Sequence, residues 1–136
     1  KADEALVYAR TQFLRQPSLA LAYKLAKLYA AEDEPKKAVE ALKVVRYTTV
    51  FLSDEVVLVK KIADFLNKHG ESELALDLYR KLIEQDGLAK ALKISLLESG
   101  AKVAMNEGET ALSSGWTLTA RKLKTPSPAK SKKAKG

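Results

Sequence analysis

The stretch IADFLNKHGESELALDLYRKLIEQDG, residues 62–87, decides the fold because it holds two amphipathic segments separated by a break at Gly70. Its apolar side chains recur at intervals of three and four residues, which places them on one face of a helix. They are Ile62, Ala63 and Leu66 before the break and Ala75, Tyr79 and Leu82 after it. Glycine readily adopts the left-handed conformation that ends many helices. The stretch therefore predicts two helices joined by a short turn.

Similar signals extend in both directions from this stretch. Pro17 ends one segment and Ser18 can cap the next, while Pro35 suits the first turn of a helix. Ser53 supplies another capping hydroxyl, and Gly87 supplies another helix stop. Together these signals predict helices over residues 3–14, 19–31, 36–48, 53–68, 72–85 and 88–105.

Two segments carry mixed signals. Residues 44–52 (VVRYTTVFL) are rich in β-branched and aromatic residues, which favour strands, but their helical neighbours predict a helix end and a linker. Residues 107–123 contain glycines, serines and threonines, which lower helix propensity. Within this second segment, Trp116 is expected to pack onto the preceding helix and close the core. The alternative is an exposed contact for a partner.

Composition excludes several kinds of protein and site. The 136 residues suffice for one domain, and 46% of them are hydrophobic and 30% charged, as in ordinary soluble domains. The chain has no cysteine, which excludes disulfides, thiolate metal sites and cysteine nucleophiles. No apolar run approaches the ~20 residues that cross a bilayer, so no membrane insertion is expected. Because the chain begins at Lys1, we expect either a cleaved leader or a fragment.

An internal repeat relates the predicted helices to one another. Ala5, Ala38 and Ala75 each stand early in a helix that follows a break, and they are 33 and 37 residues apart. A small residue in each helix lets a bulky residue of the neighbouring helix approach closely at a fixed angle. The positions expected to pack in this way are Leu25, Ala26, Tyr29, Ala38, Leu42, Ile62, Ala63, Leu66, Ala75 and Tyr79.

On these positions the chain resembles the tetratricopeptide repeat, a helix–turn–helix unit of about 34 residues. Residues 62–87 are equally similar to the pentatricopeptide repeat. The resemblance covers residues 2–89 and implies an all-α fold, a right-handed solenoid of antiparallel helix pairs with about six to seven helices. A plain antiparallel helical bundle is the alternative.

The resemblance also divides the chain. Residues 1–17 would form a half repeat or an N-terminal cap helix, residues 18–52 and 53–89 two repeats, residues 90–123 a degenerate repeat or capping helices, and residues 124–136 a basic tail of the disordered type. Ala22 and Val59 depart from the tetratricopeptide pattern, which has an aromatic residue there. Lys60 and Lys61 fall near the base-reading positions of pentatricopeptide repeats, which are usually small and polar. A code of one base per repeat is therefore not expected here.

The positive charge is concentrated at the C-terminal end. The formal net charge is +7, and the excess is carried by Arg121, Lys122, Lys124, Lys130, Lys132, Lys133 and Lys135. Residues 124–136 (KTPSPAKSKKAKG) lack large apolar side chains and are not expected to fold alone. They form either a solubilising end or an arm that lies along phosphates. The charge density favours an anionic partner such as RNA.

The sequence shows no convergent set of catalytic groups. His69 is the only histidine, and beside Gly70 it is expected to meet the last carbonyls of a helix, since a lone histidine lacks partner ligands for a metal. No glycine-rich phosphate loop and no nucleophile motif is present. We therefore expect no enzyme, no cofactor, no metal site and no small-molecule substrate.

The function expected first is that of a scaffold or adapter within a larger assembly of protein subunits. The resemblance to pentatricopeptide proteins implies an intracellular location in a mitochondrion or a plastid, and a mitochondrial ribosome or a respiratory complex such as ATP synthase is the expected kind of host. Direct RNA binding is a second hypothesis. A module that captures an acidic peptide, as in co-chaperones, is a third. For each of them, the first helices of the repeats would supply contacts on a concave face, with Lys24, Lys27, Lys60 and Lys61 as candidates.

Overall fold

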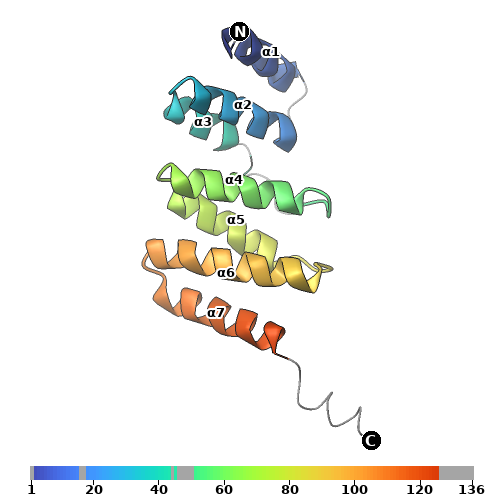
Figure 1. Ribbon diagram of the computed structural model, residues 1–136, viewed down its shortest axis with the longest axis vertical. Coiled ribbons are helices and arrows are strands. Elements are labelled where there is room, and N and C mark those ends of the chain that lie inside the picture. The colour runs from blue at the N-terminus through green and yellow to red at the C-terminus, as the bar shows by residue number, and fades with distance from the viewer. Residues whose placement is uncertain (1, 16–17, 44, 46–50, 126–136) are drawn as a thin grey trace, which may run out of the picture.

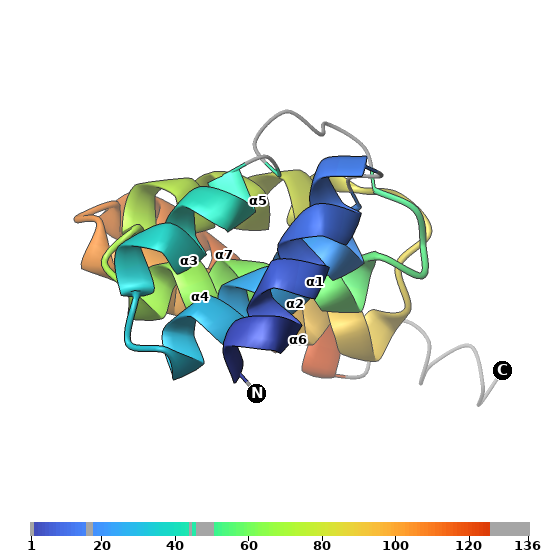
Figure 2. The same cartoon turned by 90° about the horizontal axis from the view of Figure 1, so that it is seen from above.

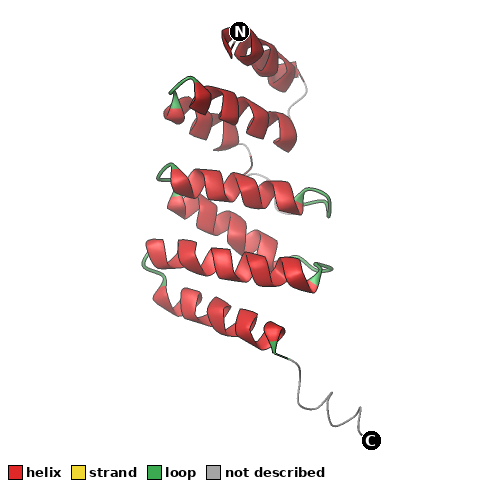
Figure 3. Cartoon of the chain, in the orientation of Figure 1, coloured by secondary structure: helices red, strands yellow, loops and turns green. Residues whose placement is uncertain are grey.

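The computed structural model describes residues 2–15, 18–43, 45 and 51–125. Within these residues the chain forms seven α-helices and no strand (Figure 3), which confirms the prediction of an all-α fold for this part of the chain. The helices are α1 (Ala2–Arg15), α2 (Leu19–Ala31), α3 (Pro35–Leu42), α4 (Val56–Lys68), α5 (Ser72–Glu84), α6 (Lys90–Asn106) and α7 (Thr110–Lys124).

The helices lie in a row in chain order, with α1 at one end and α7 at the other (Figure 1). Each helix packs against the next one in the chain. The contact of α3 with α4 is small, and α2 also contacts α4 at that place. Odd-numbered helices run in one direction and even-numbered helices run back, so consecutive helices are antiparallel. Seen along the row, the helices overlie one another (Figure 2). The molecule is therefore elongated along the row, and each part of the core is built by neighbours in the sequence.

Several predicted helix ends are found in the structure. The Ser18 hydroxyl accepts a hydrogen bond from the backbone N–H of Leu21 at 3.1 Å, as a capping side chain does. Pro35 begins α3 after a turn in which Asp33 has a φ of 61°. Gly70 has a φ of 86°, a left-handed conformation that a side chain would strain, and it turns the chain from α4 into α5.

Two predicted helix boundaries are wrong. The third helix was expected over residues 36–48, but α3 ends at Leu42; residues 44 and 46–50 lie outside the described part. Ser53 was expected to cap the fourth helix, but the N-cap residue is Glu55. The Glu55 carboxylate accepts a hydrogen bond from the backbone N–H of Leu52 at 2.8 Å, so it stabilises the turn before α4, and the helix starts at Val56.

Tertiary packing explains why residues with low helix propensity form α7. Trp116 packs against the core beside Gly100 of α6, as expected for this side chain. The buried Ser113 hydroxyl donates a hydrogen bond to the Ala101 carbonyl of α6 at 2.8 Å. Thr117 donates to the backbone carbonyl four residues earlier, which satisfies its hydroxyl inside a helix. Contacts with α6 therefore outweigh the weak intrinsic preference of this segment.

Alanines lie where consecutive helices approach closely. Ala26 of α2, Ala38 of α3, Ala63 of α4 and Ala75 of α5 have no exposed surface. The larger residues expected to pack at these contacts are also buried, apart from Tyr29, which is partly buried. They are Leu25, Leu42, Ile62, Leu66 and Tyr79. The core is thus a series of small residues with bulky aliphatic and aromatic side chains packed around them.

The contact between α6 and α7 can be tested at Gly100. A Cβ atom there would lie 3.1 Å from Cζ3 of Trp116 and 3.2 Å from Cδ1 of Ile83. We expect Gly100→Leu to lower the free energy of unfolding by about 1–3 kcal/mol, because the added atoms overpack this contact. Urea denaturation followed by circular dichroism measures the change.

Gly115 of α7 is the matched control, because a Cβ atom there meets nothing within 4 Å. Gly115→Leu is expected to raise the free energy of unfolding by about 0.5–1 kcal/mol through helix propensity alone. Equal effects of the two substitutions would contradict close packing of Trp116 over Gly100.

Candidate functional site

An aromatic cluster joins α2 to α4. The ring of Tyr23 meets the ring of Phe65 edge-on, with the centroids 6.4 Å apart and an interplanar angle of 83°. The Phe65 ring stacks on the His69 ring at 4.3 Å and 25°. All three side chains are partly buried, so each ring keeps an exposed part. We name Tyr23, Phe65 and His69 the α2–α4 cluster.

Lys27 adds a positive charge to this cluster. Its Nζ lies 4.9 Å from the centre of the Tyr23 ring, within the range of a cation–π contact. Lys27 and Tyr23 are four residues apart on α2, so they share one side of the helix. Of the four lysines predicted to line a concave face, Lys27 is the one that contacts an aromatic ring of the described structure. The pair forms a surface that can hold an acidic or aromatic group.

His69 holds the end of α4 in place. It is the C-cap residue of the helix, and its Nδ1 lies 2.9 Å from the carbonyl oxygen of Phe65. When Nδ1 carries a proton, it donates to this carbonyl, which also accepts the backbone N–H of His69 at 3.2 Å in the last turn of the helix. The predicted placement of His69 against the last carbonyls is therefore found, and the stacked Phe65 ring fixes the imidazole from one face.

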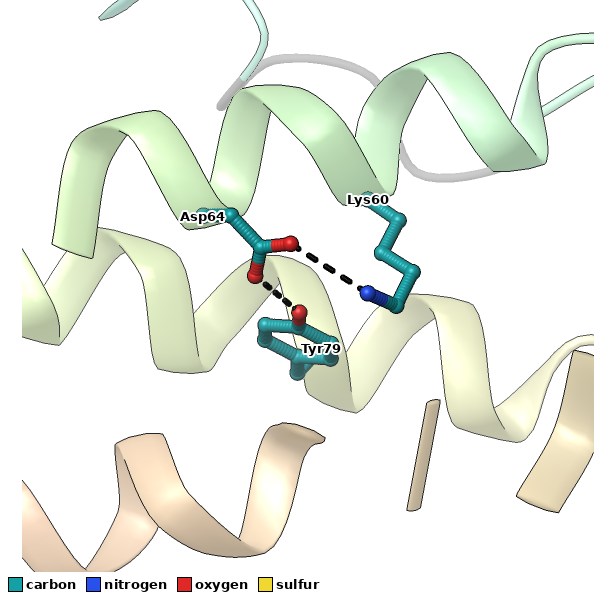
Figure 4. Close-up of polar contacts among 3 residues, drawn as sticks. All are labelled: Lys60, Asp64 and Tyr79. Carbon is teal, nitrogen blue, oxygen red and sulfur yellow. Dashed lines mark hydrogen bonds and ion pairs between the residues drawn. The ribbon is translucent and has the colours of Figure 1, made fainter. Parts of the chain in front are cut away.

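Lys60 faces a different neighbour from Lys27. Its Nζ lies 3.2 Å from Oδ2 of Asp64, and the Tyr79 hydroxyl of α5 donates a hydrogen bond to the other carboxylate oxygen, Oδ1 (Figure 4). The Lys60 charge is thus balanced by a carboxylate that also ties α4 to α5. Of the four lysines predicted as concave-face contacts, Lys60 therefore has a carboxylate beside it on its own helix.

Burial raises the pKa of the Tyr79 hydroxyl well above its ordinary value, and the hydrogen bond to Asp64 raises it further. Tyr79 has no exposed surface and lies among core side chains. This burial disfavours the charged phenolate form. The negative charge of Asp64 beside the hydroxyl acts in the same direction. Tyr79 is therefore a structural donor, and its proton is held firmly.

The remaining predicted contacts are dispersed. Lys24 and Lys61 are exposed on α2 and α4. Arg121, Lys122 and Lys124 lie in the last turn of α7, where positive charge favours the helix dipole. Lys124 forms an ion pair with Glu98 of α6. The other predicted tail contacts, Lys130, Lys132, Lys133 and Lys135, lie outside the described residues.

Sequence reasoning missed the aromatic part of this surface. Tyr23 precedes Lys27 by four residues, and Phe65 precedes His69 by four, so each helix carries a signal of two side chains on one face. The contact between Tyr23 and Phe65 has no such signal, because it joins helices that are not consecutive in the chain. It follows from the contact of α2 with α4.

Searches for two other kinds of site also bear on function. Among the residues that the structure describes, no group of three or more histidine, cysteine, aspartate or glutamate side chains could hold a metal ion. No helix in the described ranges has the length and apolar character needed to cross a membrane.

The role of Tyr79 gives a pH-dependent prediction. Above pH ~10 the unfolded chain releases the Tyr79 proton while the folded chain keeps it, so the free energy of unfolding falls by up to about 1.4 kcal/mol per pH unit from this group. Tyr79→Phe is expected to remove that part of the slope and to cost about 0.5–1.5 kcal/mol at neutral pH.

Urea denaturation at a series of pH values compares the variant with the wild type. Tyr8→Phe is the matched control, since Tyr8 is 63% exposed on α1. If Tyr79→Phe and Tyr8→Phe alter the slope above pH ~10 equally, the phenol of Tyr79 does not hold its proton as inferred.

Comparisons with known proteins give no further assignment. No protein-family model, no curated protein and no solved structure matches the chain.

Proposed function

We propose that this chain is a non-enzymatic scaffold or adapter that docks within a larger assembly of protein subunits. In this proposal the row of helices is a right-handed solenoid of antiparallel pairs, of the tetratricopeptide and pentatricopeptide kind. Two features support it. The helices pack in chain order, and Ala38 and Ala75 are fully buried 37 residues apart. A row built in this way presents extended surfaces along its length.

One observation carries the proposal: partly buried aromatic rings lie beside a cation on two helices that pack together. Tyr23 of α2 and Phe65 of α4 are in contact, and Lys27 lies over the Tyr23 ring. Aromatic side chains offer a large contact area with few rotatable bonds, and they are enriched in protein interfaces. In a solenoid, α2 and α4 would be first helices and would line its concave face. The cluster then lies where a partner segment binds.

Charge favours a protein partner over RNA at this face. The bases before Arg121 are balanced by acids, so residues 1–120, which include α2 and α4, have no net positive charge. Lys60 is paired with Asp64, and that pairing lowers the local positive potential further. Binding to a phosphate backbone depends on several unneutralised cations. A protein segment with an acidic and an aromatic residue fits the cluster better.

RNA binding is the second candidate, and the same cluster is the observation that favours it. A base can stack on an exposed ring, and a nearby cation can meet the adjacent phosphate. Arg121 and Lys122 at the end of α7 would extend the positive surface. We place the host assembly in the mitochondrion, on the resemblance of residues 62–87 to pentatricopeptide repeats.

The test compares wild type with Lys27→Glu and Tyr23→Ala in affinity purification from cells, with and without nuclease. We expect a set of co-purified subunits that survives nuclease and falls at least about tenfold with either substitution, as loss of an interface anchor predicts. Mass spectrometry quantifies the partners. Purified candidate subunits then give binding constants by isothermal titration calorimetry.

Lys36→Glu is the matched control, because it makes the same charge change at an exposed position of α3. It is expected to retain the partners. Partners that vanish with nuclease would assign the face to RNA. Equal recovery of partners with Lys27→Glu and with wild type would show that the α2–α4 cluster is not the docking surface.

A further inference from the structure

The outer face of α1 carries an apolar stripe. Val7, Tyr8 and Leu14 are 64%, 63% and 69% exposed, whereas Ala9 on the opposite side is 1% exposed against α2. The Thr11 hydroxyl donates a hydrogen bond to the Val7 carbonyl at 2.9 Å, and the Thr11 side chain is exposed on the same helix. The helix lies at the end of the row, so its outer face is turned away from the other helices (Figure 1).

This face has the spacing of a helix-pairing seam. Glu4, Tyr8, Thr11 and Arg15 are separated by four, three and four residues, which is the spacing of contact positions in a coiled coil, and Tyr8 is the one large apolar side chain among them. A shallow groove follows the seam. It is lined by Glu4, Val7, Tyr8, Thr11, Gln12 and Arg15. The seam is therefore continuous over almost the whole length of α1.

The two ends of the seam carry opposite charges. Glu4 and Arg15 are both exposed, and neither forms an ion pair with another residue in the described ranges. An antiparallel partner with the same sequence would place each of them against the other. A parallel partner would place Glu4 against Glu4 and Arg15 against Arg15, and like charges at an interface are unfavourable.

We propose that this face binds a second copy of the chain through antiparallel pairing of α1 with α1 about a two-fold axis. Glu4 then pairs with Arg15 of the partner subunit, and Tyr8 packs on Thr11 of the partner subunit. Val7 and Leu14 lie on the same flank of the seam. The two-fold axis therefore places Val7 of one subunit beside Leu14 of the partner subunit. Such a contact is self-complementary, as a two-fold interface must be. The proposal is independent of the function assigned to the α2–α4 cluster.

The size of the contact sets its strength. α1 has 14 residues and is about 21 Å long. A single helix pair of this length buries less than the ~1,200 Å² at which stable interfaces begin. The dimer is therefore weak, and it forms as the protein concentration rises. Its charged pairs lie at the ends of the contact, so added salt weakens it further.

Charge exchange tests the pairing directly. Sedimentation velocity is measured from about 1 μM to about 1 mM for the wild type, for Glu4→Arg and for Arg15→Glu. Each single variant places like charges at both ends of the pair, so we expect self-association at least about tenfold weaker than wild type. The doubly exchanged variant restores both ion pairs. An equimolar mixture of the two single variants forms a heterodimer with both ends matched.

Two further variants separate pairing from folding. Glu107→Arg and Arg121→Glu make the same charge changes at exposed positions far from α1, and they are expected to associate as the wild type does. Circular dichroism checks that α1 stays helical in each variant. In the mixture of the two single variants each chain carries only one exchanged residue, so regained association reports the pairing of charges between chains. A wild type that stays monomeric at ~1 mM overturns the proposal. The proposal is also overturned if Glu4→Arg and Arg15→Glu associate as strongly as the wild type. It is overturned as well if an equimolar mixture of these two variants does not regain the association of the wild type.

Discussion

Close approach of consecutive helices is the constraint on which the rest of the structure depends. It requires a small side chain on each helix of a pair, and Ala26 with Ala38, and Ala63 with Ala75, meet that requirement without any exposed surface. A larger side chain at such a position would push two helices apart and open voids beside the core residues. The two pairs then meet where α2 and α3 contact α4, and there Tyr23 of α2 meets Phe65 of α4.

Local signals predicted much of the fold because most helix ends are set locally. The hydroxyl of Ser18, the ring of Pro35 and the left-handed backbone of Gly70 act within a few residues of the end that they define. Ser53 shows the limit of such signals, because it lies two residues before the N-cap residue of α4, which is Glu55. A residue type that suits a cap therefore indicates a boundary to within a turn of helix.

Other features depend on contacts between helices and could not be predicted in the same way. Residues 110–124 have weak helix propensity, and they are helical because Trp116 and Ser113 find partners on α6. The α2–α4 cluster arises from rings on helices that another helix separates in the chain. The spacing of four residues indicates the pair of Lys60 with Asp64, but the hydrogen bond from Tyr79 of α5 to Asp64 joins two helices and has no such local signal. Charge counted along a sequence therefore overstates the number of cations that a face presents.

Packing in chain order also determines how motion spreads through the molecule. Because contacts are mostly between helices close in the sequence, few long loops must close before the core forms, which favours rapid folding. Opening of an end helix disturbs mainly one neighbour, so amide exchange should be fastest in α1 and slower toward the middle of the row. We therefore expect each helix to stay rigid and motion to occur at the contacts between neighbouring helices. The row can bend along its length to fit a surface while each pair of neighbouring helices keeps its own side-chain contacts.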